Sequence, residues 1–260
     1  MMRKGLKTTA KLPRAVLARI RMNGPRGPRF AGAYSSRAAA LATLPDRQKA
    51  GYDDASIANV SFDWMTQRAS WDYPVLYWLK TLAVDGSQIL DAGGHLGTKY
   101  IAFSSVWDMN LIRWTVYDMP QIIGVARDRQ NQGQLPAAIK FIDDIGAAAP
   151  TDILIASGLV QYLDEPFEGF IDRLSPRPKY IILNKVPLWQ REGLVTLERI
   201  GSARVPYQIR SSFAWKAEID RMGYNIVDQW SIDSLSHEIA THPWLPKNES
   251  RGFVLRNRSM

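Results

Sequence analysis

The stretch ILDAGGHLGTKY, residues 89–100, places a carboxylate directly before a glycine-rich turn. The apolar run that ends at Asp91 predicts a buried strand, and the residues from Gly97 onward predict the start of a helix. A strand, a tight turn and a helix N-terminus together form a crevice suited to nucleotide-like ligands. Three ligands have to be told apart: a dinucleotide, a phosphate group and S-adenosylmethionine.

The first two ligands fit the turn poorly. A dinucleotide fingerprint, G-x-G-x-x-G, would end on Gly97 and would need a glycine where Ala92 stands. A phosphate-binding loop needs Lys and then Ser or Thr after its last glycine, whereas here Thr98 precedes Lys99 after too short a loop. An NAD(P)-dependent oxidoreductase is therefore kept only as an alternative.

The third template, an acidic residue followed by G-x-G-x-G, fits better. Asp91, Gly93 and Gly97 match it. His95 replaces the middle glycine, and Gly94 lies one position early. S-adenosylmethionine has an ammonium group and no phosphate, so a carboxylate at the strand end can bind it through charge-assisted hydrogen bonds. The glycines would let the backbone approach this cofactor closely, and His95 is expected to contact it.

A second acidic residue is expected at the end of the next strand, where it would bind the ribose hydroxyls. The segment IRWTVYDMP supplies Asp118, which follows Asp91 by 118 − 91 = 27 positions. Pro120 marks the end of that strand, and one strand–helix–strand unit has about this length. Asp118 is therefore assigned to the same cofactor.

The two following strands supply further cofactor candidates. Asp143 or Asp144, in FIDDI, could hydrogen-bond the adenine amino group. Ser157 and Gly158, in IASGLVQYL, would lie under the methyl group of the cofactor. Open α/β sheets bind ligands at this carboxyl edge.

Strands and helices alternate along the chain, which indicates a largely parallel sheet covered on both faces. We expect strands at 88–92, 112–118, 139–143, 152–157, 179–185, 224–230 and 251–257, and helices at 71–83, 97–107, 120–131, 165–174 and 212–222. The last two strands have no helix between them. This suggests a final antiparallel strand inserted beside the parallel ones, the order seen in class I methyltransferases. Residues 30–60 are expected to form a helix and loops.

The positive charge is concentrated at the N-terminus. Of the net charge of +8, residues 1–45 supply ten basic side chains and no acidic one, which leaves 8 − 10 = −2 for the rest. This basic arm could contact an anionic membrane, and LPRAVLARIRM has the loosely helical spacing of a membrane-surface helix. No recognised nucleic-acid-binding motif accompanies the charge, so no nucleic-acid partner is expected.

Composition limits the cellular setting. The absence of cysteine excludes disulfides and thiolate metal sites. No apolar run is long enough for a transmembrane helix, and the N-terminus lacks the apolar block of a secretory signal. The expectation is a cytoplasmic protein, with peripheral contact at the inner membrane face through the arm.

Several segments carry a family resemblance over roughly residues 29–257: FAGAYSSRAAA, GYD, ILDAGGHLGTKY, WTVYDMP, ASGLVQYL, VTLERIG, VPYQI, MGYNIVDQW and RGFVLRN. Through them the chain resembles a family of S-adenosylmethionine-dependent methyltransferases from bacterial surface-polysaccharide and lipopolysaccharide loci. The resemblance implies an α/β, Rossmann-like class I methyltransferase fold and S-adenosylmethionine as cofactor. The fold would have a seven-stranded, mostly parallel sheet with the last strand antiparallel. We expect a basic arm over 1–28, a helical cap over 29–84 and the methyltransferase domain over 85–260.

Transfer of a methyl group to a hydroxyl needs an aligned acceptor and a base. His237 and His242, in DSLSHEIATHPWLP between the last two strands, are the candidate bases. Asn184 and Lys185, at a strand tip, could orient a substrate hydroxyl, and Trp244 could stack on a sugar ring. No metal motif is visible, so no metal is expected.

The sequence thus predicts an S-adenosylmethionine-dependent O-methyltransferase that acts on a sugar hydroxyl of a glycan or small-molecule substrate. Besides the oxidoreductase, one alternative is a non-catalytic scaffold that keeps the same fold. His95 in the glycine turn is the feature that favours the scaffold.

Overall fold

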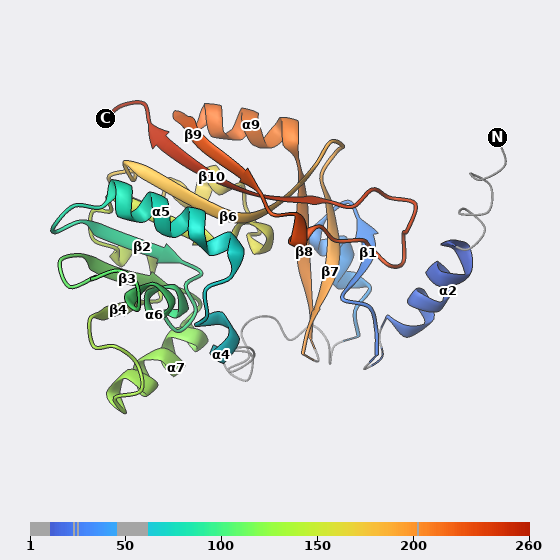
Figure 1. The fold of residues 1–260 in the computed structure, drawn as a ribbon. Coiled ribbons are helices and arrows are strands. Elements are labelled where there is room, and N and C mark those ends of the chain that lie inside the picture. Colours follow the sequence, from blue (N-terminus) through green and yellow to red (C-terminus); the bar gives the residue numbers. More distant parts are fainter. Residues whose placement is uncertain (1–10, 23, 25, 46–61, 202) are drawn as a thin grey trace.

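A β-sheet of ten strands forms the centre of the described protein (Figure 1). The computed structural model describes residues 11–22, 24, 26–45, 62–201 and 203–260. The strands are β1 (Phe30–Tyr34), β2 (Gln88–Ala92), β3 (Arg113–Tyr117), β4 (Ile139–Ile142), β5 (Ile153–Ser157), β6 (Tyr180–Trp189), β7 (Leu194–Ile200), β8 (Ala203–Ser211), β9 (Tyr224–Ser231) and β10 (Glu249–Asn257). The α-helices are α2 (Lys11–Arg21), α3 (Arg37–Ala42), α4 (Phe62–Met65), α5 (Tyr73–Leu82), α6 (Thr98–Ser104), α7 (Pro120–Asn131), α8 (Phe167–Ile171) and α9 (Ser212–Arg221). Short 3-10 helices are η3 (Ser70–Asp72), η4 (Ile145–Ala147), η5 (Val160–Tyr162) and η6 (Asp233–Leu235).

Five parallel strands form the middle of the sheet in the order β4-β3-β2-β5-β6. Strand β10 lies antiparallel between β6 and β9. All seven predicted strands are present, and the predicted insertion of the last strand is confirmed. The parallel arrangement brings the carboxyl ends of β2, β3, β5 and β6 to one edge of the sheet, where such folds bind ligands.

Helices cover both faces of these parallel strands. Because side chains alternate along a strand, neighbouring residues of β2 and β5 enter different cores. Ile89 and Ile153 pack in the cluster that contains buried residues of α5, α6 and α7. Leu90 and Leu154 pack in the cluster that contains buried residues of α8 and α9. The apolar runs in the sequence thus reflect strands that are buried on both faces.

Three strands that the sequence analysis did not predict extend the sheet. β1, β7 and β8 pair antiparallel, and β8 joins the parallel strands beside Leu188 and Trp189 at the end of β6. The expectation of a helix and loops over residues 30–60 is thus wrong for 30–34, because these residues pair with β7. The helix in that segment is α3, and residues 46–61 lie outside the described part. The domain boundaries expected at residues 28 and 84 stay a prediction.

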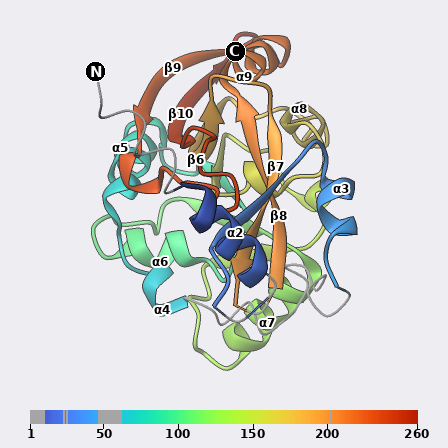
Figure 2. The same cartoon turned by 90° about the vertical axis from the view of Figure 1, so that its right-hand side faces the viewer.

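Helix α2 forms the described part of the basic arm and lies beside the β1–β7–β8 strands (Figure 2). It contacts the segment between β9 and β10, where Lys11 Nζ donates to the carbonyl of Pro243 at 2.9 Å and Arg19 lies over the Trp244 ring. The helix predicted around LPRAVLARIRM is confirmed. No helix in the described ranges is long and apolar enough to cross a membrane.

The buried carboxylate of Glu198 on β7 ties the added strands to the parallel sheet. One oxygen accepts hydrogen bonds from Arg29 Nε and Nη2 at 2.9 and 2.7 Å, just before β1. The other accepts from the hydroxyl of Tyr162 at 2.5 Å, in η5 after β5. Glu198 is 3% exposed, so these partners replace its contact with water.

The Glu198→Ala variant is expected to lose about 2–4 kcal/mol of unfolding free energy, because the change removes the buried acceptor of the hydrogen bonds from Arg29 and Tyr162. Urea unfolding measures this loss. Glu192→Ala, at an exposed position, is the matched control and should stay within about 0.5 kcal/mol of wild type. Equal losses in the two variants would show that the Glu198 contacts are not stabilising.

Candidate active site

The glycine turn between β2 and α6 has the backbone conformation of a close-approach loop. Gly93 and Gly97 have φ angles of +70° and +78°, and His95 has φ of +55°. A Cβ atom on Gly94 would lie 2.7 Å from Cγ of Asp91. Any side chain at Gly94 would therefore collide with the carboxylate, which lies directly beneath the turn.

Asp91 at the end of β2 is a buried carboxylate with an unsatisfied oxygen. Its side chain is 1% exposed, and Oδ2 has no hydrogen-bond partner among the described residues. Burial raises the pKa of Asp91 to about 7, against the opposing effect of the Lys99 charge. A buried acceptor without a donor is costly, and a cationic donor group bound at the turn would relieve that cost.

Asp118, after β3, fixes the turn to the neighbouring strand. Its Oδ2 accepts a hydrogen bond from the backbone N–H of His95, and its Oδ1 accepts one from Met119, both at 2.8 Å. Burial raises the pKa of this carboxyl as well, against the two backbone hydrogen bonds. The structure thus brings Asp91, the glycines, His95 and Asp118 together at one edge of the sheet.

The two aspartates after β4 already have partners within the chain. Asp143 is exposed and forms an ion pair with Arg127 at 3.2 Å. Asp144 Oδ1 accepts from the backbone N–H of Gly146 at 2.9 Å and caps η4. Within the described residues, no three His, Cys, Asp or Glu side chains are grouped so that they could hold a metal ion.

A buried ion pair that the sequence analysis missed lies beside the turn. Lys99, in the first turn of α6, places Nζ 2.6 Å from Oδ1 of Asp72, which is 1% exposed. In the sequence, Lys99 fits only the rejected phosphate-loop template, and Asp72 has no predicted role. The WDYP segment held one signal, an Asp directly before a helix that starts with Tyr-Pro, which is typical of a helix N-terminus.

Four residues predicted for the acceptor and methyl positions, Asn184, Lys185, Ser157 and Gly158, lie side by side at the carboxyl edge. Asn184 Nδ2 donates to the carbonyl of Trp71 at 3.0 Å and to Ser157 Oγ at 3.4 Å, and the backbone N–H of Gly158 donates to the Asn184 carbonyl at 3.0 Å. Asn184 Oδ1 is buried and has no partner in the described structure. Lys185 follows with φ of +62° and its Nζ 5.7 Å from the centroid of the Trp71 ring.

The two candidate bases, His237 and His242, belong to the segment between β9 and β10, which contacts β1 through Phe30 and Gly32. The His237 ring stacks on Phe30 with 4.5 Å between ring centroids. Burial, with the charge of Arg29, lowers the pKa of His237 to about 4, so its ring is a weak base at neutral pH. Burial also lowers the pKa of His242, whose Nδ1 lies 2.9 Å from Thr241 Oγ1. The catalytic roles of both residues stay predictions.

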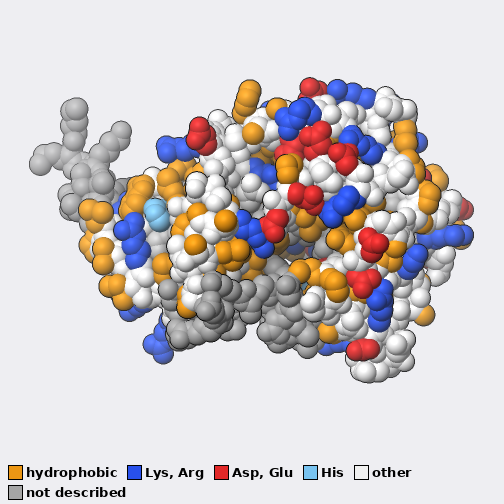
Figure 3. All heavy atoms as spheres, turned by 180° about the vertical axis from the view of Figure 1, so that it is seen from behind, with side chains coloured by type: hydrophobic (Ala, Val, Ile, Leu, Met, Phe, Trp, Pro, Cys, Tyr) orange, Lys and Arg blue, Asp and Glu red, His pale blue; other side chains and the backbone are white. Residues whose placement is uncertain are grey.

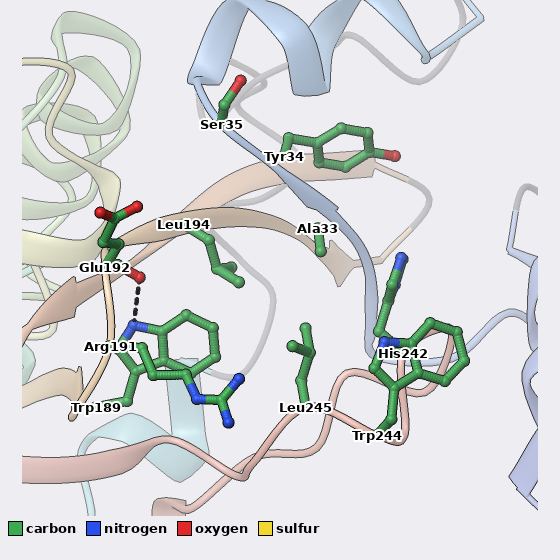
Figure 4. Close-up of a pocket in the computed structure, with 11 residues that line it drawn as sticks. Ala33, Tyr34, Ser35, Trp189, Arg191, Glu192, Leu194, His242, Trp244 and Leu245 are labelled. Atoms are coloured by element: carbon green, nitrogen blue, oxygen red, sulfur yellow. Dashed lines mark hydrogen bonds between the residues drawn. The ribbon is translucent and has the colours of Figure 1, made fainter.

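An open hollow of about 570 Å³ lies beyond the end of β6 (Figure 4). Its lining includes aromatic, basic and acidic side chains: Tyr34, Trp189, Arg191, Glu192, His242 and Trp244. Trp189 is fixed because its Nε1 donates to the carbonyl of Glu192 at 2.8 Å, whereas Trp244 is 50% exposed. Trp244, the residue predicted to stack on the substrate, thus lines this hollow.

Comparison with known proteins gives likenesses in structure alone. No family model matches the sequence, and no curated protein matches it either. LepI in complex with S-adenosylmethionine aligns with a TM-score of 0.50 and 13% identity, over 96% of this chain and 65% of LepI. The N-terminal domain of EvdMO1 with bound S-adenosylhomocysteine aligns with a TM-score of 0.50 and 10% identity, over 74% and 83%.

A third structure is the Burkholderia thailandensis 1,6-didemethyltoxoflavin-N1-methyltransferase, at a TM-score of 0.49 and 13% identity over 72% of this chain and 78% of that enzyme. At such identities, a likeness shows the fold and nothing further. Together with the strand order of the sheet, the first two likenesses show the α/β class I methyltransferase fold predicted from the sequence.

The Lys99→Met variant is expected to lose about 3 kcal/mol of unfolding free energy, because it leaves the buried Asp72 carboxylate unpaired. The double variant Lys99→Met/Asp72→Asn should lose less than Lys99→Met alone. Urea unfolding of Lys99→Met, Asp72→Asn and the double variant measures the coupling, and Lys80→Met, at an exposed lysine on α5, is the control. The pair would be shown to be uncoupled if the double variant lost the sum of the single losses.

Proposed function

We propose that this protein is an S-adenosylmethionine-dependent methyltransferase. The observation that carries the proposal is the buried Asp91 carboxylate, whose Oδ2 has no hydrogen-bond partner among the described residues. It lies directly beneath a turn whose backbone is left-handed at Gly93 and Gly97. The ammonium group of the cofactor would supply the missing donor. LepI and the EvdMO1 domain, which share the fold, were solved with S-adenosylmethionine and S-adenosylhomocysteine respectively.

The residues at the edge of the sheet fit the parts of this cofactor. The Asp91 turn would hold the methionine part. Asp118, whose oxygens each accept one backbone N–H, keeps lone pairs for ribose hydroxyls. Asp143 or Asp144 would contact the adenine amino group, and Ser157 and Gly158 would lie near the methyl group. When bound, the cofactor supplies an electrophilic methyl carbon on its sulfonium.

The alternatives have less support. An NAD(P) pyrophosphate at this turn would meet the Asp91 carboxylate, which repels it. A non-catalytic scaffold was favoured by His95, but His95 has φ of +55°, in the left-handed region that glycine adopts freely. The turn therefore keeps a glycine-like conformation at this position, and the substitution gives no reason to expect a closed site.

The acceptor that we propose is a sugar hydroxyl of a glycan or a smaller sugar substrate. The hollow beyond β6 supports this proposal, because the half-exposed Trp244 and the partly buried Tyr34 offer rings on which a sugar can stack. Arg191 and Glu192 add hydrogen-bonding groups of both signs. The setting in surface-polysaccharide or lipopolysaccharide synthesis rests on the sequence resemblance.

Helix α2 supports a peripheral contact with an anionic lipid bilayer. Four apolar side chains on it are exposed, by 61% at Leu12, 53% at Val16, 45% at Leu17 and 76% at Ile20. The helix also carries Lys11, Arg14, Arg19 and Arg21 and no acidic residue. Apolar and basic side chains gather over this end of the molecule in Figure 3. An anionic membrane matches both the charge and the exposed apolar surface.

Calorimetric titration tests the cofactor. The wild type should bind S-adenosylmethionine and S-adenosylhomocysteine but not NADH. Because Asp91 has a raised pKa of about 7, its carboxyl is largely protonated below that pH and must lose a proton to pair with the ammonium group. The affinity should therefore rise several-fold from about pH 6 to about pH 7.5.

The Asp91→Asn variant should bind at least about tenfold more weakly and lose this pH dependence, since an amide neither titrates nor neutralises the ammonium group. Asp128→Asn, at an exposed position on α7, is the matched control and should bind like wild type. A wild type that bound neither sulfur compound would support the scaffold instead, and binding of NADH alone would support the oxidoreductase.

Co-sedimentation with vesicles tests the membrane contact. The protein should bind vesicles that contain phosphatidylglycerol more tightly than pure phosphatidylcholine vesicles, and salt should weaken the binding. Leu12→Ser/Ile20→Ser should reduce the binding by about tenfold or more, because two apolar side chains no longer enter the bilayer. Leu111→Ser, an exposed apolar position next to β3, is the control. Equal binding by all three proteins would refute the contact.

A further inference from the structure

Strand β6 contains a bulge at its functional edge. Leu183 pairs with Phe253 of β10 and Val186 pairs with Arg251, so that Asn184 and Lys185 together face the single residue Gly252. Bulges redirect side chains and are frequent beside active sites. The bulge at Lys185 also has a left-handed backbone, with φ of +62°, which is strained for a residue with a side chain.

The Lys185 side chain lies among groups from several elements at this edge. Its Nζ lies over the Trp71 ring, and its Cδ lies 3.7 Å from the position that a Cβ of Gly158 would take. The charged groups that act on it are Lys99 of α6, Asp72 of η3 and Asp91 of β2. Among the described residues, no carboxylate lies within ion-pair distance of the Lys185 ammonium group. Asp72 forms its ion pair with Lys99 instead, at 2.6 Å.

This environment disfavours a positive charge on Lys185. Burial acts most strongly, and Lys99 adds repulsion, while Asp72 and Asp91 act in the opposite direction. Together they lower the pKa of Lys185 to about 8, so that a useful fraction of the amine is neutral near physiological pH. A neutral amine has a lone pair that can accept a proton. General bases are most effective when their pKa lies near the working pH.

We propose that Lys185 is the catalytic base of the transfer, and that the bulge of β6 holds its amine where the acceptor hydroxyl must lie. This inference rests on the proposed methyltransferase function. The hydroxyl proton goes to the lone pair of Nζ, which becomes an ammonium group. The acceptor oxygen keeps the electron pair with which it bonds the methyl carbon, while the carbon–sulfur bond breaks and its pair stays on sulfur.

Lys185 fits this role better than the other candidates. Lys99 lies closer to the glycine turn in the chain, but its amine is engaged by Asp72. His237 stacks on Phe30 in the β1–β7–β8 part of the molecule. Lys185 follows Asn184, which pairs directly with Ser157 at the end of β5, where the methyl group is expected.

Competitive acetylation of the cofactor-free protein tests whether the amine titrates as proposed. Trace acetic anhydride is applied across a pH series, and the label at each lysine is counted by peptide mass spectrometry. Lys185 should reach half of its maximal reactivity near pH 8, about two units below an ordinary lysine side chain in water. Half-maximal reactivity of Lys185 at about pH 10.4, as for an ordinary lysine, would overturn the proposal.

Lys185→Met and Lys185→Arg separate a base from a cofactor ligand and from a structural residue. Both variants should bind S-adenosylhomocysteine within about threefold of wild type, because a base need not hold the cofactor. A loss of more than about tenfold would instead assign Lys185 to the cofactor. Lys179→Met, an exposed lysine that lies over Tyr180, is the matched control for both measurements.

Transfer from S-adenosylmethionine to a panel of methyl glycosides completes the test. Both variants should lower kcat by about a hundredfold or more with little change in KM, and should lose the rise in rate near pH 8. Arginine keeps the charge and the contact with Trp71 but cannot deprotonate, so rescue by Lys185→Arg would refute the base. A wild type that binds S-adenosylhomocysteine yet methylates no glycoside would contradict the acceptor class, and the acetylation result would then decide for or against Lys185.

Discussion

The burial of the Asp91 carboxylate beneath the glycine turn is the constraint on which the rest of the site depends. The backbone at Gly94 passes so close to this carboxylate that a Cβ would lie 2.7 Å from its Cγ. The turn must then continue through positive φ angles, which His95 and Gly97 adopt, before α6 can begin. Asp118 holds the turn in that path by accepting the N–H of His95. The protein thus keeps a costly buried acid at the one place where a cationic ligand group would relieve its cost.

Three further charged groups, Lys99, Asp72 and Lys185, act on one another near Asp91. Their pairing determines which amine can lose its proton. Lys99 and Asp72 form an ion pair with each other, so Lys185 has a repelling neighbour in Lys99, a cation–π contact with Trp71 and no ion-pair partner among the described residues. Perturbed groups of this kind gather at functional sites, because burial and like charges shift them toward the pH at which they act. The Lys99–Asp72 ion pair and the bulge of β6 are therefore two independent features that support Lys185 as the proposed base.

The strands β1, β7 and β8 form a second region of the molecule, beside the parallel strands. They carry the hollow next to Trp189 and Trp244, and they pack against His237 and the segment between β9 and β10. Glu198 joins this region to the parallel sheet through Arg29 and Tyr162. Because Trp189 and Lys185 belong to the same strand, four residues apart, a glycan that reached the proposed base would extend about 13 Å to the hollow.

The sequence by itself determined the seven strands, the insertion of β10 and the acid-plus-glycine turn, because these depend on local apolar runs and on glycine's freedom to adopt positive φ. It left β1, β7 and β8 unassigned, although alternating residues around Gly201 are typical of a hairpin. Only the tertiary structure decided that Lys99 pairs with Asp72 and that Lys185 lies on a bulge. These features join segments that are distant in the chain, and burial together with the field of neighbouring charges exists only once the sheet has assembled.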